Sequence, residues 1–420
     1  MQQGNASRRE FIKTGSIALA STLTAGSYRR VYGANEKILL GSIGCGGRGR
    51  WHIGWVHRSA QVVPAEIIAV CDIWDAQRQR GAEEVSKRFG REPKQYANYL
   101  ELLQNADIDA VIIATPDHQH CGQLMDAVQA GKDAYVEKPI AVNLDELNKA
   151  YDVVMESAQI VQNGTQGRSS AGALTTRNFL QEGKLGKIIR IEESRSQYYP
   201  YWNHYEKPES EKVTDWEAFL FNQPDRPFDP DQHGSWMGYK AYSPNTIGGW
   251  MSHMSDFIHY VTGADYPVSA IAHGGIYSPT SHEARTCPDT VTAILDYAEG
   301  FSTLFTTHFG NGANNYDLIF GSRGTMRINP PDGNDNGINP RVSGEGSEHP
   351  EKLGEETKLE LIPHDDHMVN FLKCIVSREQ PNAHMGHGHK QGVAVLLAEA
   401  ARVNERKMKY DKEKREICPA

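Results

Sequence analysis

A glycine-rich turn followed by an acidic residue has the most specific spacing in this chain. Gly44, Gly46 and Gly49 form Gly-x-Gly-x-x-Gly directly after the apolar run 38–43, and Asp72 ends the next apolar run. Such glycines let the backbone approach a pyrophosphate, the amides of the next helix face its negative charge, and the acid accepts ribose hydroxyls. We therefore expect a dinucleotide site, rather than an ordinary glycine turn, formed by Gly44, Cys45, Gly46, Gly47, Arg48, Gly49 and Asp72.

The elements around this turn predict a doubly wound α/β domain. Between residues 37 and 141, short apolar strands alternate with helical patterns, which is typical of a parallel sheet. Ligands of such sheets bind beyond the carboxyl ends of the strands. The polar residues expected there are Thr115, Pro116, Asp117 and His120 after one strand, and Glu137 and Lys138 after another. The strands are expected at 38–43, 67–71, 110–114 and 134–136, and the helices at 49–58, 75–89, 99–104, 119–130 and 144–158.

The second half of the chain changes to alternating apolar and polar residues, which predict a mostly antiparallel sheet. Residues 329–356 are poor in apolar side chains and are expected to form a surface loop, whereas 393–403 has the pattern of an amphipathic helix. The strands are expected at 188–193, 268–274, 290–297, 301–309, 317–321 and 325–328, with a tight turn at Glu299 and Gly300.

These motifs resemble those of the glucose-fructose oxidoreductase and inositol dehydrogenase family, Gfo/Idh/MocA. The resemblance implies a Rossmann domain followed by an open-faced sheet domain, NAD or NADP with Gln166 among its ligands, and a sugar or polyol substrate. We therefore expect a signal and linker at 1–34, an NAD(P)-binding domain at 35–160, and at 161–420 an α+β domain that binds substrate and forms a homo-oligomer through its sheet. The resemblance rests on the Gly44 turn, Asp72, 112–116 with His120, Glu137-Lys138-Pro139, Gly164-Thr165-Gln166-x-Arg168-Ser169, Gly183-x-x-Gly186, Gly388-His389 and 409–411.

Lys138 is the principal catalytic residue that the resemblance implies. Oxidising a secondary alcohol requires a base for the hydroxyl proton, and a lysine beside a cationic ring has its pKa drawn toward neutrality. The alternative is a turn with a solvated ammonium group. Pro139 is expected to fix the local backbone, and a cis bond before it is energetically accessible. No arginine follows Asp72 until Arg78 to receive a phosphate, which favours NAD over NADP.

The second catalytic element departs from the family pattern of an Asp and a His four residues apart on a helix. Depending on the alignment, either Gly249 or Phe257 occupies one of those positions. His253 and Asp256 are three residues apart, so they can share a helical face as an imidazole–carboxylate pair, and His253 is our candidate partner of Lys138. Two alternatives stay open: the polar residues satisfy a buried helix, or they form part of a metal site.

Tyrosines and tryptophans are crowded between residues 198 and 250. Aromatic faces pack against the C–H faces of sugars, so these residues are candidates for the walls of a carbohydrate cleft. The alternative is that they hold irregular segments together. The substrate-binding candidates are Arg168, Tyr199, Trp202, Trp236 and Trp250.

The composition favours a small, weakly charged ligand. The chain has 420 residues, a formal net charge of -9 and no basic run beyond the N-terminus, so nothing indicates a nucleic-acid partner. The six cysteines form no Cys-x-x-Cys pair, which argues against a disulfide scaffold or a thiolate zinc site. We expect no metal at the late histidines either, because their spacing enforces no coordination geometry: His364, His367, His384, His387 and His389.

The N-terminus has the form of a twin-arginine export signal, although an amphipathic tail is the alternative. Arg8 and Arg9, followed by Phe11 and Lys13, precede an apolar run at 17–25 that is shorter than the about 20 residues needed to span a bilayer. We therefore expect a periplasmic or extracellular protein without an integral span. Because this route carries folded proteins, we expect the cofactor to travel tightly bound and to be recycled inside the site.

The function expected from the sequence is an exported NAD(P)-dependent oxidoreductase that acts on a hydroxyl of a sugar, glycoside or polyol. Two alternatives stay open. One is a redox-neutral glycosidase or lyase on the same scaffold, in which transient oxidation acidifies a neighbouring C–H group before a leaving group is eliminated. The other is a sugar-binding protein without turnover.

Overall fold

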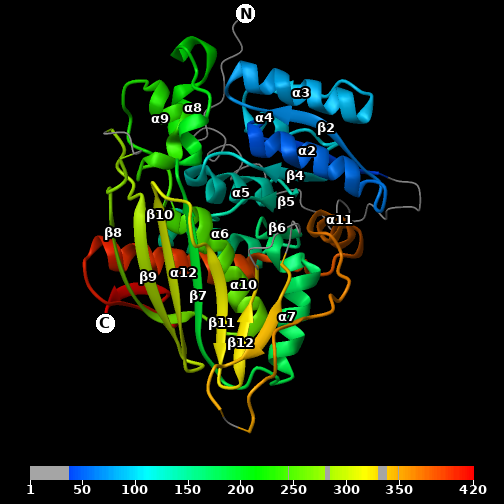
Figure 1. Cartoon of the computed structure of the whole chain (residues 1–420). Helices are drawn as coiled ribbons and strands as arrows, with labels where there is room; N and C mark the ends of the chain where they lie inside the picture. The colour runs from blue at the N-terminus through cyan, green and yellow to red at the C-terminus, as the bar shows by residue number, and fades with distance from the viewer. Residues whose placement is uncertain (1–36, 245, 280–283, 330–337, 349) are drawn as a thin grey trace, which may run out of the picture.

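Two β-sheets organise the chain (Figure 1). The computed structural model describes residues 37–244, 246–279, 284–329, 338–348 and 350–420. The first sheet has six strands in the order β3-β2-β1-β4-β5-β6, and every pair is parallel. The second has ten strands in the order β14-β13-β12-β11-β7-β10-β9-β8-β15-β16. The predicted fold class is confirmed, and the expected signal at 1–34 lies outside the described residues.

The parallel sheet forms from continuous apolar runs, because strands covered on both faces do not need to alternate. All seven residues of β2 are buried. The side chains of Asn98 and Asn143 accept backbone hydrogen bonds at the starts of α4 and α6, and Gly90 ends α3 in the left-handed region at φ 67°. The elements are β1 (Ile38–Ile43), α2 (Gly47–Ser59), β2 (Ala65–Cys71), α3 (Asp75–Phe89), β3 (Lys94–Tyr96), α4 (Tyr99–Leu103), β4 (Ala110–Ile113), α5 (His120–Gln129), β5 (Asp133–Val136), α6 (Leu144–Met155) and β6 (Val161–Asn163).

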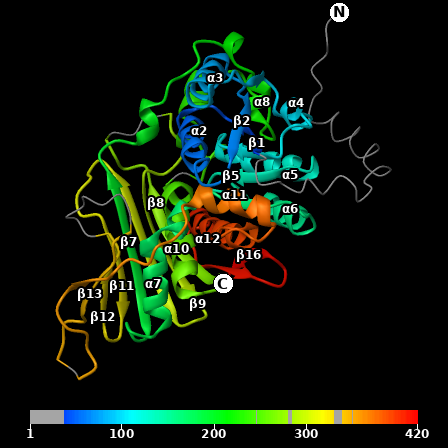
Figure 2. The same cartoon turned by 90° about the vertical axis from the view of Figure 1, so that its right-hand side faces the viewer.

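The second sheet is antiparallel except where β7 and β10 run parallel. Along β10, buried and half-buried residues alternate, as expected for a sheet covered on one face. Helices α7 (Ala171–Gln181), α10 (Ser252–Thr262) and α12 (Met385–Val403) lie beside this sheet on the side of the Rossmann domain (Figure 2). The strands are β7 (Ile188–Gln197), β8 (Pro267–Gly275), β9 (Thr290–Tyr297), β10 (Phe301–Phe309), β11 (Tyr316–Gly321), β12 (Gly324–Arg327), β13 (Arg341–Gly344), β14 (Thr357–Lys358), β15 (Met408–Asp411) and β16 (Glu416–Pro419).

Six strands lie where the sequence analysis expected none: β3, β6, β13, β14, β15 and β16. β13 falls inside the segment 329–356 that we expected to be a loop, and it pairs with β12. Its sequence is Arg-Val-Ser-Gly, so a single apolar residue, Val342, marks its buried side. β6 begins at Val161, one residue after the expected end of the first domain, and joins the parallel sheet.

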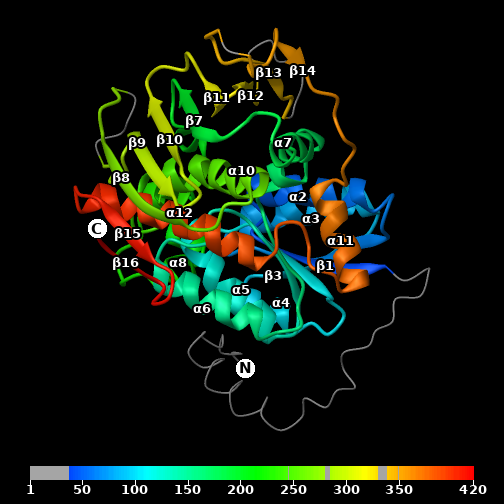
Figure 3. The same cartoon turned by 90° about the horizontal axis from the view of Figure 1, so that it is seen from below.

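Helix α11 (His367–Ser377) completes the core of the Rossmann domain although it lies far later in the chain. It packs beside α2, as Figure 3 shows. Met368, Phe371 and Leu372 are fully buried in one cluster with Leu40 and Ile67 of the parallel sheet. The apolar interior of the first domain therefore depends on residues from the C-terminal part.

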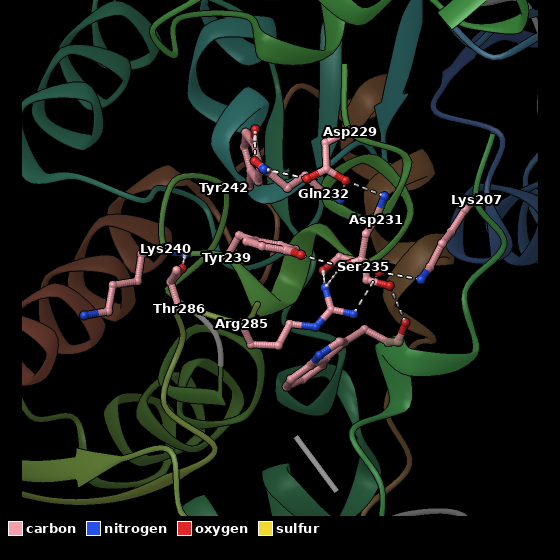
Figure 4. A network of polar contacts seen from close by, with 11 residues as sticks. Lys207, Asp229, Asp231, Gln232, Ser235, Tyr239, Lys240, Tyr242, Arg285 and Thr286 are labelled. Atoms are coloured by element: carbon pink, nitrogen blue, oxygen red, sulfur yellow. Dashed lines mark hydrogen bonds and ion pairs between the residues drawn. The ribbon is translucent and has the colours of Figure 1, made fainter. Parts of the chain in front are cut away.

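Residues 198–244, which we call the cap segment, run between β7 and α10 and carry the short helices α8 (Trp216–Leu220) and α9 (Pro230–Gly234). Asp231 is central to a polar network in this segment (Figure 4). It accepts hydrogen bonds from Lys207, Tyr239 and, at 2.7 Å, the guanidinium of Arg285, which lies between β8 and β9. The network fastens the cap segment to the connection between β8 and β9.

Candidate functional site

The glycine turn has the geometry that a dinucleotide needs. Gly44 has φ 89°, and a Cβ there would lie 2.6 Å from the carbonyl oxygen of Ala114. A Cβ on Gly49 would lie 1.9 Å from the carbonyl oxygen of Gly44, so the turn closes on the start of α2 only with glycine. Gly46 and Gly47, in contrast, have open space where a side chain would be, on the side that a pyrophosphate would occupy. The residues of this turn therefore fit a bound dinucleotide.

Asp72 holds this turn in place. Its carboxylate accepts hydrogen bonds from the backbone amides of Cys45 at 2.7 Å and Trp74 at 2.9 Å. Burial raises the pKa of Asp72, and these two amides oppose the shift. Each oxygen keeps a further lone pair for a ribose hydroxyl. Arg78 is engaged with the Asp72 carbonyl oxygen at 2.9 Å and with Asp75 at 2.6 Å, which leaves it poorly placed to receive a ribose phosphate.

Glu137 is a buried carboxylate at the carboxyl end of β5. Its Oε1 lies 2.8 Å from Nε2 of His52 and 2.9 Å from Nε2 of Gln166, and 3.8 Å from Nε of Arg48. Burial favours the protonated acid, but the hydrogen bond from His52, together with the charges of Arg48 and Lys138, holds the pKa of Glu137 well below its usual range. Glu137 is therefore an anion between the glycine turn and Lys138.

Lys138 bridges the two domains. Its peptide bond to Pro139 is cis, as considered from the sequence, and its half-buried Nζ donates a 2.9 Å hydrogen bond to the carbonyl oxygen of Gly249. Burial lowers the pKa of Lys138, against the opposing charges of Glu137 and Asp117. The residue thus has the lowered basicity that a proton-transferring amine requires.

His253 lies in the first turn of α10, close enough for the Lys138 charge to act on it. Burial, and then the charge of Lys138, lower the pKa of His253 to about 3, so the imidazole is neutral at physiological pH. Within the described part of the chain, no hydrogen-bond partner engages its ring. His253 is therefore available as a neutral donor or acceptor beside the amine.

The expected imidazole–carboxylate pair of His253 and Asp256 is not formed. Asp256 instead receives two charge-assisted hydrogen bonds from Arg168, with Nη2 at 2.7 Å from Oδ1 and Nε at 3.0 Å from Oδ2. The two side chains are 2% and 1% exposed. Arg168, expected to bind substrate, and Asp256, expected to assist catalysis, thus satisfy each other in the interior, as the alternative interpretation of this helix anticipated.

The residues after β4 are fastened to neighbouring segments. Both ring nitrogens of His120 face backbone carbonyl oxygens, which can only accept: that of Pro139 at 2.7 Å and that of Thr115 at 2.9 Å. Asp117 follows Pro116 and accepts a 2.6 Å hydrogen bond from Ser243 of the cap segment. Burial raises the pKa of Asp117 to about 7. The turn thus places a weakly acidic carboxyl group near Lys138.

The aromatic residues mostly hold segments together. Trp202 is 3% exposed and packs edge-on against Phe309, so it is a core residue and does not line a cleft in this structure. Trp250 also contacts Phe309, and Trp236 is half-buried in the same cluster. Tyr199 is 52% exposed. Of the expected aromatic wall, Tyr199 alone is widely accessible among these four residues.

The late histidines serve as structural hydrogen-bond partners. His367 contacts Ser169 at 2.7 Å, His389 contacts Tyr266 at 2.8 Å, and His384 accepts the Gly386 amide at the start of α12. In the part of the chain that the structure describes, no group of three or more metal-binding side chains is found, and no helix is long and apolar enough to cross a membrane.

Two residues of this site were missed in the sequence analysis. His52 faces Glu137 across 85 positions of sequence, and Ser243 faces Asp117 across 126. Neither belongs to a motif. His52 does lie three residues after Gly49, on the helix that follows the glycine turn, which is the one local indication that it faces the site.

Residues 38–165 match the family model GFO_IDH_MocA, described as an oxidoreductase family with an NAD-binding Rossmann fold. The chain carries the NAD-binding domain of the Gfo/Idh/MocA family. The expected family and the expected NAD cofactor are thereby confirmed.

Solved Gfo/Idh/MocA structures share the two-domain fold. A levoglucosan dehydrogenase in complex with NADH and levoglucosan aligns with a TM-score of 0.68 at 16% identity, covering 89% of this chain and 99% of that one. The aldose-aldose oxidoreductase from Caulobacter crescentus, complexed with glycerol, aligns with a TM-score of 0.67 at 17% identity, covering 89% and 100%.

Relatives by sequence carry other names. A glycosyl hydrolase family 109 protein from Shewanella sp. (strain ANA-3) is 30% identical over 211 residues, which are 44% of this chain and 45% of the relative. An alpha-N-acetylgalactosaminidase from Shewanella oneidensis is 28% identical over 214 residues, or 45% of each chain. The match thus spans less than half the length of these relatives.

Proposed function

We propose that this protein is an oxidoreductase that transfers hydride between a CH–OH group of a sugar, glycoside or polyol and a tightly bound NAD. One observation carries the proposal. The amine of Lys138, with its lowered pKa, lies at the carboxyl end of β5, and the glycine turn follows β1 two strands away in the same parallel sheet. Ligands of doubly wound sheets bind at this edge.

The chain's residues divide the chemistry between them. The glycine turn and Asp72 would hold the dinucleotide, and Glu137 and Asp117 surround the place where Lys138 acts. When bound, NAD supplies the acceptor and donor of the hydride. Lys138 as a neutral amine takes the hydroxyl proton from the alcohol that is oxidised and returns it on reduction. His253, neutral and unpaired in the described residues, orients the substrate oxygen.

The cap segment supports tight cofactor retention. It contacts the Rossmann edge beside Asp72, where Asp215 N donates to Ile73 O at 3.2 Å and Thr214 forms a β-bridge with Trp74. It also contacts the other side of that edge, where Ser243 binds Asp117. A segment fastened at both ends of the binding edge would hinder release of the bound cofactor. We therefore propose that this protein is exported with its NAD already bound.

The test begins with the protein as purified. Denaturation followed by mass spectrometry of the supernatant should release nicotinamide dinucleotide, at about one per chain. Sugars and polyols should then produce a single burst of absorbance at 340 nm, and adding a carbonyl acceptor should reverse it. A protein that binds no nicotinamide at any concentration would refute the proposal, and a protein that holds NAD but shows no absorbance change with any sugar would be a binding protein only.

A redox-neutral glycosidase is the second candidate. It is favoured by the glycosyl hydrolase family 109 and alpha-N-acetylgalactosaminidase names of the relatives, and by the absent Asp–His relay. In such a reaction, transient oxidation would acidify the neighbouring C–H group and the aglycone would be eliminated. Water would then add to the double bond that remains, and return of the hydride would restore the hydroxyl group and the NAD. Cleavage of an aryl α-N-acetylgalactosaminide in D₂O without acceptor, with deuterium entering the carbon next to the anomeric centre, would select this candidate. Cleavage without deuterium, or no cleavage, would exclude it.

A further inference from the structure

We infer that His52 is a positioning residue that fixes the Glu137 carboxylate and thereby sets the protonation of the Lys138 amine. Its catalytic consequence rests on the proposed function, whereas its effect on Lys138 does not. His52 belongs to α2, the helix that begins at the glycine turn, so the link runs from the dinucleotide-binding element to the reacting amine.

The contact between His52 and Glu137 is buried and directional. Nε2 of His52 lies 2.8 Å from Oε1 of Glu137, with the side chains 0% and 5% exposed. A carboxylate accepts only, so Nε2 carries the hydrogen and donates it. Nδ1 is buried and has no partner in the described structure. The neutral Nε2–H tautomer is therefore the form that leaves no hydrogen unsatisfied.

Packing holds the imidazole in this orientation. Its ring is stacked on Trp55 at a centroid distance of 5.8 Å and meets the edge of Tyr135 at 5.0 Å. Trp55 is stacked in turn on His367, which hydrogen-bonds to the Ser169 hydroxyl at 2.7 Å. A ring enclosed in this way cannot turn from Glu137 without disturbing the core.

Glu137 transmits the constraint to Lys138. Its other oxygen, Oε2, accepts the backbone amide of Lys138 at 3.1 Å, and Gln166 donates to Oε1 at 2.9 Å. A Cβ on Gly164 would lie 3.0 Å from Oε2, so the carboxylate is pressed against the backbone there. Of the two side chains that donate neutral hydrogen bonds to Glu137, His52 alone comes from the helix of the glycine turn.

These contacts determine the direction in which loss of His52 moves the pKa of Lys138. The Glu137 anion raises the pKa of Lys138 against burial. Loss of the His52 donor makes the buried carboxyl easier to protonate and less well placed, so the pKa of Lys138 falls further. The other charged or titratable groups facing this cluster are Arg48 on α2, Asp117 and His120 after β4, Tyr135 on β5, His253 on α10 and His367 on α11.

The experiment titrates Lys138 directly. The protein is labelled with lysine ¹³Cε, the Lys138 resonance is identified by its absence in Lys138→Arg, and its shift is followed with pH in wild type, His52→Phe and His52→Gln. We expect His52→Phe to lower the Lys138 midpoint by about half a pH unit or more, and His52→Gln, which retains a donor of similar reach, to keep it near wild type. His57→Phe, on the same helix but packed against Phe89, is the matched control.

Three results would overturn the inference: an unchanged midpoint in His52→Phe, an equal shift in His52→Gln, or an equal shift in His57→Phe. If His52→Phe does not fold, His52→Asn serves in its place, because asparagine is too short to reach Glu137 and should shift the midpoint where glutamine does not. The titration also separates failure of this inference from failure of the proposed function. Even if the protein oxidises no sugar, the Lys138 midpoint either shifts in His52→Phe or does not. Where activity is present, its pH profile should move with the Lys138 resonance.

Discussion

The Lys138 amine donates a 2.9 Å hydrogen bond to the carbonyl oxygen of Gly249, and this contact joins the two domains at the site. Gly249 lies in the short π-helix η6 (Ile247–Met251), which leads directly into α10 and His253. π-Helical turns are frequent at functional sites because they place backbone groups outside the regular helical ladder. In the proposed reaction, a substrate hydroxyl would use the remaining positions on the amine.

Replacing Lys138 should remove hydride transfer without removing the cofactor. Lys138→Met keeps much of the side-chain volume but has no base, and we expect the burst rate to fall by about 10²- to 10⁴-fold. Lys138→Arg should be similarly inactive, since a guanidinium does not become neutral in this pH range. Stopped-flow absorbance at 340 nm measures the burst, and Lys184→Met, at an exposed lysine, is the control. Full activity in Lys138→Met would refute the assigned role.

The pH dependence should be governed by the Lys138 amine, with Asp117, whose pKa is about 7, titrating beside it. The pKa of Lys138 is lowered from 10.5 by burial, so the rate of alcohol oxidation should rise with pH as the amine loses its proton and level off below pH 10.5. The reverse reduction should fall over the same interval. His253 has a pKa of about 3, so its titration should not change the pH–rate profile between about pH 5 and pH 8. A profile that falls with pH in the oxidation direction would contradict this assignment.

Two glycines of the turn should respond differently to alanine. At Gly46 a Cβ meets nothing within 4 Å, so Gly46→Ala should leave the melting temperature near wild type but weaken NAD binding by intruding on the pyrophosphate. At Gly49 a Cβ would lie 1.9 Å from a backbone oxygen, so Gly49→Ala should lower both stability and NAD content. Thermal unfolding and fluorescence titration with NADH measure the two effects. Equal behaviour of both variants would contradict this geometry.

The buried pair of Arg168 and Asp256 should be stabilising as a unit. Removing one partner leaves an uncompensated charge in the interior, so Arg168→Met or Asp256→Asn should each lower the free energy of unfolding by about 3 to 5 kcal/mol. The double variant should lose much less free energy of unfolding than the two single variants lose together. Urea unfolding of the four proteins gives the coupling energy, and additive losses would show that the two residues act independently.

Local patterns predicted most of the fold. The apolar runs of the parallel sheet, the glycine turn with Asp72, and the alternation along β9 and β10 were all visible in the sequence, since each depends on neighbouring residues. β13 was missed because Val342 is its sole apolar residue. The dependence of the Rossmann core on α11 was also missed, because packing between distant segments has no local signal.

The candidate site was predictable where a motif defines it and unpredictable where distant residues meet. Lys138, Glu137 and the glycine turn are brought together as expected. Helical spacing could equally pair Asp256 with His253 or leave it for another segment, and the structure pairs it with Arg168. His52 could not be assigned to Glu137 from spacing, because 85 residues of chain separate them.

The late position of α11 has a consequence for biosynthesis. Met368, Phe371 and Leu372 fill the interior against Leu40 and Ile67, so apolar side chains of the first domain lack part of their cover until α11 has been made. Domains usually fold in the order in which they are made, but this one must wait until α11 has been made. Until then the exposed apolar surface is a natural target for chaperones, and a chain that stops before α11 should aggregate.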